Sequence, residues 1–185
     1  MEDPGRDSNR FQYERFLLTQ LLVMSLKGVP AFYLPALLAS ENDIKSFSMT
    51  GQRRDLNREK FKSEKLEAVF KNPESNANKN LKYLKNAMDV RAKLPQFHPQ
   101  SHMECLSKNR ADIIALKRGI GSKAVFTIHN MTENKINYRF IDYEFNKLIK
   151  NDLNMQDYLT SNKYNSNNIE LDPFQVIWLG YLIDD

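Results

Sequence analysis

The chain has 185 residues, of which 41% are hydrophobic and 11% aromatic, a composition typical of globular rather than disordered proteins. Its formal net charge is +4, and no block of like charges marks a nucleic-acid-binding surface. The longest apolar run, residues 16–26, is interrupted by polar residues and is too short to span a bilayer.

The cysteine content and the N-terminal sequence indicate in which cellular compartment the protein is expected. Cys105 is the only cysteine, which excludes an intramolecular disulfide and favours a reducing environment. The first ten residues are charged and polar, unlike a signal peptide. We therefore expect a cytoplasmic protein with neither a membrane segment nor a nucleic-acid partner.

The first predicted elements are a helix and a buried strand. Residues 10–24 show apolar side chains at helical spacing over more than half of the circumference. Gly28 follows a basic residue and is a typical helix stop. The near-continuous apolar run over residues 29–34 predicts a strand buried on both faces, as in a parallel sheet. Together they indicate an α/β unit.

A polar loop and two helices are predicted next. The loop covers residues 41–58, and five Arg, Asp and Glu residues crowd into residues 53–59. One helix is predicted over residues 64–70, and a longer one after the break at Pro73. The longer helix ends before "LPQFHP", whose prolines forbid its continuation. Its expected apolar stripe consists of Leu81, Leu84, Met88 and Ala92.

The pattern changes to strands after His98. Residues 113–117 and 123–129 alternate in hydrophobicity and are joined by "RGIGS", which predicts a hairpin. "KINYRFI" predicts a third strand, and "FQVIWLGY" the last one. We expect a small antiparallel β-sandwich here. The lone parallel strand of the first half has no sheet to join, so that half looks like the tail of a larger α/β structure.

Several segments resemble the sucrose phosphorylase branch of the α-amylase clan of glycoside hydrolases. "SLKGVPAFYLPALLASEND" and "TGQRRDLNREKF" resemble its last barrel strand and the loop that follows. "LKYLKNAMDVRAKLPQFHP" resembles its last barrel helix, and "LDPFQVIWL" the closing strand of its β domain. Arg53 stands where the family has a glycine, which affects the turn of the loop. The matching positions are Gly28, Val29, Pro30, Tyr33, Asn42, Asp43, Thr50 and residues 54–58.

The resemblance implies a fold in two parts. Residues 1–100 would be the C-terminal part of a (β/α)8 barrel, containing a helix, strand eight, the active-site loop and the final helices. Residues 103–185 would be a C-terminal antiparallel β domain. Sucrose phosphorylase, sucrose 6-phosphate phosphorylase and glucosylglycerate phosphorylase are not separated by this portion of the chain.

The resemblance also implies a role for the charged loop, because active sites of such barrels lie in the loops after the strands. Arg54 would contact the sugar of the glucosyl subsite through forked hydrogen bonds. Asp55 and Arg58 would orient it, and Asn57 would brace the loop. A purely structural cluster of salt bridges also explains these charges. Asn42 and Asp43 are expected to cap the loop rather than to catalyse.

The carboxylates that such chemistry needs are missing from the chain. Retaining glycoside chemistry uses two carboxylates about 5–5.5 Å apart, one as nucleophile and one as acid/base. In this family they follow earlier strands, so we expect no catalytic residue here and no activity of the chain alone. The resemblance implies no metal and no organic cofactor. The full enzyme would transfer a glucosyl group between a disaccharide-like donor and phosphate.

The sequence also leaves an alternative to the barrel fragment open. The chain would be a stand-alone carbohydrate-binding or protein-interaction module if its aromatic residues formed a sugar platform. A fragment of a barrel, by contrast, would bind the missing barrel portion or self-associate through an exposed apolar surface over residues 11–38. The side chains expected on that surface are Phe11, Leu18, Leu22, Phe32 and Leu34.

Overall fold

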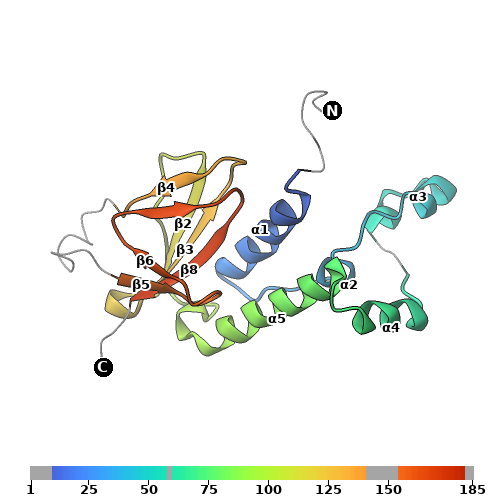
Figure 1. The fold of residues 1–185 in the computed structure, drawn as a ribbon, viewed down its shortest axis with the longest axis horizontal. Coiled ribbons are helices and arrows are strands. Elements are labelled where there is room, and N and C mark those ends of the chain that lie inside the picture. The colour runs from blue at the N-terminus through green and yellow to red at the C-terminus, as the bar shows by residue number, and fades with distance from the viewer. Residues whose placement is uncertain (1–9, 58–59, 141–153, 182–185) are drawn as a thin grey trace. The chain divides into compact units, whose positions relative to one another are not determined.

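The computed structural model describes residues 10–57, 60–140 and 154–181. The chain divides into two compact units (Figure 1). One comprises Met1–Val29 with Met88–Asp185, and the other comprises Pro30–Ala87. Among the described helices, none combines the length and the apolar character needed to cross a membrane.

The first unit begins with helix α1, Gln12–Ser25, which confirms the predicted helix. Leu18, Leu21 and Met24 are buried at intervals of three residues, the spacing of one helix face. This face contacts strand β3, Val125–Asn130, and Figure 1 shows α1 lying beside the sheet. The expectation that Leu18 is exposed is therefore wrong, because the β strands of the same chain cover it. Leu34 is exposed as expected, and Phe11, Leu22 and Phe32 are half-buried.

The described β strands form an antiparallel six-stranded sheet with a two-stranded sheet beside it. The larger sheet has the order β1-β2-β3-β8-β5-β6, and β4 pairs with β7 in the smaller one. The predicted hairpin is confirmed, since β2 and β3 pair from Ile113↔Asn130 to Arg118↔Val125. The remaining bounds are β1 Met103–Cys105, β2 Ile113–Arg118, β4 Ile136–Tyr138, β5 Asn154–Asp157, β6 Lys163–Asn165, β7 Ile169–Leu171 and β8 Val176–Tyr181.

The core of this unit lies between the two sheets. Strands β2, β3, β5, β7 and β8 contribute aliphatic side chains to it, and Phe126 contacts Phe140 and Tyr181 edge-on. Strand β3 is buried along its whole length because α1 covers its other face. Trp178 of β8 packs against Phe97, with ring centroids 4.7 Å apart. Phe97 belongs to the short helix η2, Pro95–Phe97.

The C-terminal end of α1 is held by two arginines. Arg118 of β2 is completely buried, and its guanidinium donates hydrogen bonds to the carbonyls of Ser25 (2.8 Å) and Leu26 (2.7 Å). It also donates to the carbonyl of His98 at 3.1 Å. Arg91 donates to the carbonyls of Met24 and Gly28, each at 3.0 Å. These bonds satisfy carbonyls that a helix end leaves without partners.

A buried histidine lies at the same junction. Ser25 Oγ is 3.2 Å from His129 Nε2, and His129 Nδ1 is 3.0 Å from the carbonyl oxygen of Ile114. The neutral imidazole with its proton on Nδ1 donates to the Ile114 carbonyl. The Ser25 hydroxyl donates to the Leu21 carbonyl at 2.8 Å and lies beside Nε2. Burial disfavours the charged imidazolium and lowers the pKa of His129 to about 4.

Among its described residues, the second unit contains four α-helices or parts of α-helices. They are α2 Leu34–Leu37, α3 Ile44–Thr50, α4 Ser63–Lys71 and the first part of α5, Asn76–Lys93. The last two confirm the predicted helices. In the expected stripe of α5, Leu84 is buried, Leu81 and Met88 are half-buried and Ala92 is exposed.

Asparagine amides join the helices of this unit. Asn80 donates to the carbonyls of Ala36 (3.0 Å) and Leu37 (2.8 Å), at the end of α2. Asn78 donates to the carbonyls of Val69 and Phe70 in the last turn of α4. Both asparagines are buried, so their amides replace the water that these helix ends would otherwise bind.

The strand predicted over residues 29–34 is wrong. No strand is formed there; residues 29–33 are irregular, and α2 follows with Pro35 in its first turn. Val29 is 81% exposed rather than buried. A parallel strand exists only when neighbours complete its hydrogen bonds, and none of the described strands pairs with this segment.

The polar loop predicted over residues 41–58 is partly wrong, because it contains α3 and a short helix η1, Arg53–Asn57. Asp43 caps α3: its Oδ1 accepts a hydrogen bond from the Ser46 backbone N–H at 2.9 Å. Gly51 ends the helix with φ of 67°, a left-handed conformation that suits glycine.

The two-arginine junction predicts a large loss of stability in Arg118→Met. This change leaves the Ser25 and Leu26 carbonyls buried without their donors, and we expect the free energy of unfolding to fall by about 3 kcal/mol. Arg110→Met is the matched control, since Arg110 pairs with Asp112 at the surface and its loss should cost less than about 1 kcal/mol. Urea unfolding of both variants checks this. Equal losses would contradict a special role for Arg118.

The buried imidazole predicts a loss of stability at mildly acidic pH. The unfolded chain takes up a proton on His129 near pH 6.5, whereas the folded chain stays neutral down to about pH 4. Stability attributable to His129 is therefore present above pH 6.5 and falls by about 3 kcal/mol as the pH drops to 4. Urea unfolding across this range should show the fall, and His129→Gln should lack it.

The wild type and the His129→Gln variant share all their other titrating groups. Desolvation raises the pKa of Asp157, so the folded state holds this proton to higher pH than the unfolded state does. Asp157 thus acts in the opposite direction, and only the difference between wild type and His129→Gln isolates His129. Parallel stability curves for the two proteins would contradict the prediction.

Candidate functional site

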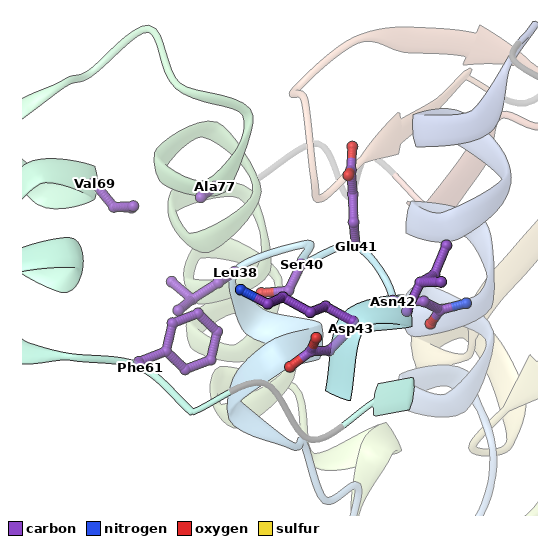
Figure 2. Close-up of a pocket in the computed structure, with 10 residues that line it drawn as sticks. Leu38, Ser40, Glu41, Asn42, Asp43, Phe61, Val69 and Ala77 are labelled. Atoms are coloured by element: carbon purple, nitrogen blue, oxygen red, sulfur yellow. The ribbon is translucent and has the colours of Figure 1, made fainter. Parts of the chain in front are cut away.

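A cavity of about 520 Å³ lies in the second unit, at the start of α3. In the view of Figure 2, Leu38, Phe61, Val69 and Ala77 lie on one side, and Glu41, Asn42 and Asp43 lie on the other. The cavity thus has an apolar side and a polar side. Its lining consists of Leu38, Ser40, Glu41, Asn42, Asp43, Ile44, Lys45, Phe61, Val69 and Ala77.

Asp43 organises the polar side of this cavity. Besides capping α3 through Oδ1, its Oδ2 accepts a hydrogen bond from the Ser46 hydroxyl at 2.6 Å. Its backbone N–H donates to the carbonyl of Leu56 in η1 at 2.6 Å. The start of α3 is thus tied to the end of η1. The expectation that Asp43 is a capping residue is confirmed.

A second contact joins α3 and η1 at their other ends. The Thr50 hydroxyl donates to Asp55 Oδ2 at 2.5 Å, and the Asp55 backbone N–H donates to the carbonyl of Gln52 at 2.9 Å. Asp55 is half-buried. Its carboxylate therefore shapes the turn between the two helices.

Arg54, the residue expected to contact sugar, lies on η1 with its side chain exposed. It does not line the cavity, and none of the residues described by the structure accepts a hydrogen bond from its guanidinium. Asn57 ends η1, and Arg58 falls outside the described residues. The structure thus pairs Thr50 with Asp55 and ties Asp43 to Leu56 of η1, whereas the Arg54 side chain is exposed.

The groups that line this cavity can form hydrogen bonds and ion pairs with a ligand. Glu41, Asn42, Asp43 and Ser40 offer acceptors and donors, and Lys45 adds a positive charge. Within residues 10–57, 60–140 and 154–181, no group of three or more His, Cys, Asp or Glu side chains is placed to hold a metal ion. Such a lining suits a hydroxylated or polar ligand on an apolar floor.

Sequence reasoning missed the cavity and the helix beside it. The signal for the helix was present: Asp43 is a typical residue for a helix start, and Gly51 is a typical residue for a helix stop. The apolar side of the cavity, with Phe61 and Val69, follows from tertiary packing and had no local signal.

Comparison with known proteins places this geometry in context. No family model matches the chain. Glucosylglycerate phosphorylase from Allomeiothermus silvanus is 31% identical over 134 residues, which are 72% of this chain and 24% of the relative. Glucosylglycerate phosphorylase from Escherichia coli is 22% identical over 165 residues, 89% of this chain and 28% of the relative. The chain thus spans about a quarter of the length of these curated relatives.

Solved structures show a related fold. Isomaltulose synthase from Klebsiella sp. superimposes with a TM-score of 0.67 at 18% identity, covering 95% of this chain and 39% of the synthase. The α-amylase from Geobacillus thermoleovorans superimposes with a TM-score of 0.64 at 16% identity, covering 90% of this chain and 33% of the amylase. These are α-amylase-type (β/α)8 barrel proteins, and the antiparallel sheet of this chain corresponds to an all-β domain at their C-terminal end. The chain belongs to the sucrose phosphorylase branch of the α-amylase clan and corresponds to a C-terminal portion of such a protein.

Proposed function

We propose that this chain supplies the last strand region, the following active-site loop and the β domain of a retaining phosphorylase that transfers an α-glucosyl group to phosphate. The similarity to two glucosylglycerate phosphorylases is the observation that carries the proposal. A disaccharide-like sugar and phosphate are the proposed substrates of the whole protein, in the cytoplasm. The proposed division follows the resemblance, with the barrel part in residues 1–100 and the β domain in residues 103–185.

The proposed reaction needs two carboxylates about 5–5.5 Å apart. In this proposal they come from the barrel strands that precede these residues in the whole protein, so the 185-residue chain alone is inactive. What this chain adds is shape and hydrogen-bonding capacity at the mouth of the barrel, where catalytic loops of such folds lie.

Arg54 is the proposed sugar contact. Its guanidinium is exposed on η1 and is not engaged by any residue in the described part of the chain, so it is available to form forked hydrogen bonds with hydroxyl or carboxylate oxygens. The bonds from Thr50 to Asp55 and from Asp43 to Leu56 hold η1 against α3. We propose that Asp55, Asn57 and Arg58 position Arg54 through this loop rather than touch the sugar.

The exposed apolar residues around the irregular segment fit the same proposal. Val29, Tyr33 and Leu34 are exposed, although their side chains are those of a buried strand. We propose that neighbouring barrel strands pair with residues 29–33 and cover these side chains. Self-association of the chain through the same residues is the alternative.

A chimera tests this function. The 185-residue chain replaces the matching portion of the Allomeiothermus silvanus glucosylglycerate phosphorylase, and phosphate-dependent formation of glucose 1-phosphate is measured. We expect an active chimera and an inactive isolated chain. A chimera that folds, by circular dichroism, but releases no glucose 1-phosphate would contradict the proposal.

Substitution of Arg54 in the active chimera tests its role. Arg54→Ala should lower kcat/KM by about 10- to 100-fold, equivalent to about 1.4–2.7 kcal/mol, because it removes a charged hydrogen-bond donor to the sugar. Arg53→Ala is the matched control, since Arg53 is the preceding exposed arginine of the same helix. Equal kcat/KM values for the two variants would show that Arg54 does not contact the substrate.

A further inference from the structure

A second, smaller cleft lies in the unit that contains the β sheets, and nothing in the proposed function uses it. Its volume is about 180 Å³, which suits a small ligand, since pockets for drug-sized ligands are larger. Four segments meet there: η2, the end of helix η3 (Gly121–Lys123) with the residue after it, the turn after β5, and the end of β8. The lining residues are Gln96, Ser122, Lys123, Ala124, Tyr158 and Tyr181.

The polar side chains that face this cleft can all donate hydrogen bonds. Lys123 offers an ammonium group with three donors, and hydroxyl donors come from Ser122, Tyr158 and Tyr181. Burial raises the pKa of the Tyr181 phenol, which therefore keeps its proton at physiological pH. No carboxylate is among the described lining residues. Gln96 adds no acceptor, because its Oε1 is buried and its Nε2 donates to the Lys123 carbonyl at 2.6 Å.

The segments around the cleft carry positive charge without negative charge. Residues 90–103 and 113–132, which include η2 and the β2–β3 hairpin with η3, contain no Asp or Glu. Among the described residues, no carboxylate pairs with Arg91, Arg118 or Lys123. The described residues at this end of the unit therefore carry a net positive charge, which attracts anions. The Lys and Arg residues of the two segments are Arg91, Lys93, Lys117, Arg118 and Lys123.

The carboxylate next to Tyr158 in the sequence, Asp157, is already occupied by donors of the chain. It is completely buried and does not line the cleft. Its Oδ1 accepts hydrogen bonds from the backbone N–H groups of Leu159 at 3.2 Å and Trp178 at 2.8 Å. Its Oδ2 accepts one from the Thr160 hydroxyl at 2.6 Å. Asp157 therefore adds no acceptor to the cleft.

Two glycines allow the donors to meet at one place although they are distant in the sequence. A Cβ atom on Gly180 of β8 would lie 2.1 Å from the Tyr158 hydroxyl, so this phenol lies directly against the strand backbone. A Cβ atom on Gly119 would lie 2.8 Å from Gln96 Cγ, and φ of 83° at Gly119 also disfavours any other residue. Close approach at Gly119 thus brings the hairpin loop that carries Lys123 against η2.

We propose that this cleft binds a phosphate group, either as inorganic phosphate or as the phosphoryl end of a phosphate monoester. Lys123 supplies the positive charge, and the hydroxyls of Tyr158 and Tyr181 donate to the phosphate oxygens from the other walls. A phosphate group fits better than a carboxylate, because it presents three acceptor oxygens to donors that come from three segments. The site belongs to the first unit, whereas Arg54 belongs to the second, so it does not depend on the proposed phosphorylase function.

The test is a nuclear magnetic resonance titration of the nitrogen-labelled 185-residue chain with sodium phosphate near neutral pH, at an ionic strength held constant with sodium chloride. We expect saturable shifts of the backbone amide signals of Ser122, Lys123, Tyr158 and Gly180. A parallel titration with D-glucose 1-phosphate distinguishes the two sources of the phosphate group. Equal shifts there mean that the cleft also takes esters, and shifts with inorganic phosphate alone mean that it takes the free ion. D-Glucose should leave these signals unmoved.

Substitutions at the cleft assign the binding to its donors. Lys123→Met should weaken phosphate binding at least about tenfold, whereas Lys123→Arg keeps the charge and should retain most of the affinity. Tyr158→Phe removes only a hydroxyl and should weaken binding about two- to tenfold. Both residues are exposed, so these variants should fold as the wild type does. Lys108→Met is the matched control, since Lys108 is an exposed lysine of the same unit outside the cleft, and it should bind normally.

Four results would overturn the proposal. Phosphate could give no saturable shift, or D-glucose could give the same shifts as phosphate. Lys123→Met could bind phosphate as tightly as Lys108→Met does, which would mean that the cleft does not hold the ion. Saturable shifts confined to η1, where Arg53 and Arg54 lie, would place the phosphate in the other unit instead. Inactivity of the phosphorylase chimera would leave all of these readouts unchanged.

Discussion

The hydrogen bonds from the guanidinium groups of the buried Arg118 and the half-buried Arg91 to the end of α1 are the interaction on which the first unit depends. Desolvation lowers the pKa of both Arg91 and Arg118, and within the described ranges of the chain no carboxylate pairs with either. Their counter-charge is the partial negative charge of the helix C-terminus, concentrated on the carbonyls of residues 24–28. The ring centroid of Phe97 lies 5.7 Å from Arg91 Cζ and 5.4 Å from Arg118 Cζ, so this ring adds a cation–π contact to each guanidinium.

This arrangement explains why an apolar helix keeps a single position on the sheet. Apolar packing of Leu18 and Leu21 fixes which face of α1 meets the sheet. Because this packing is not directional, it would be nearly as favourable if the helix were shifted along its axis. The hydrogen bonds to four carbonyls and the Ser25–His129 contact fix the position of α1 along its axis, because a shifted helix would leave buried polar groups unpaired. The junction therefore also fixes where the chain leaves α1, at Gly28.

The sequence predicted the elements whose hydrogen bonds are local or closed within the chain. The hairpin of β2 and β3 and the helices α1, α4 and α5 each carry their own periodicity and stop signals. The segment over residues 29–34 carries an equally clear strand pattern, yet its pairing partners are not among the described strands, so the segment has no strand to pair with.

For the candidate site, the capping role of Asp43 was predictable, whereas the cavity depends on Phe61 and Val69, which are distant from Asp43 in the sequence. The roles of Arg91 and Arg118 had no sequence signal, since an arginine that binds a helix end and an arginine at the surface look alike in a charged sequence.

The two units differ in how they are stabilised, and this difference bears on function. In the described part of the second unit, residues 30–87, the buried apolar side chains other than proline are Leu38, Leu84 and Ala87, and the joints between helices are amide-to-carbonyl hydrogen bonds. So few buried apolar groups contribute little of the hydrophobic free energy that stabilises a domain. Regions of low local stability are where ligand-binding loops reside, because they rearrange at low cost. The η1 loop with Arg54 belongs to this unit, while the first unit, with its larger buried core, carries the arginine junction. Under the proposed function, cover from neighbouring barrel strands would order the second unit, and the loop would reach its working geometry only in the whole protein.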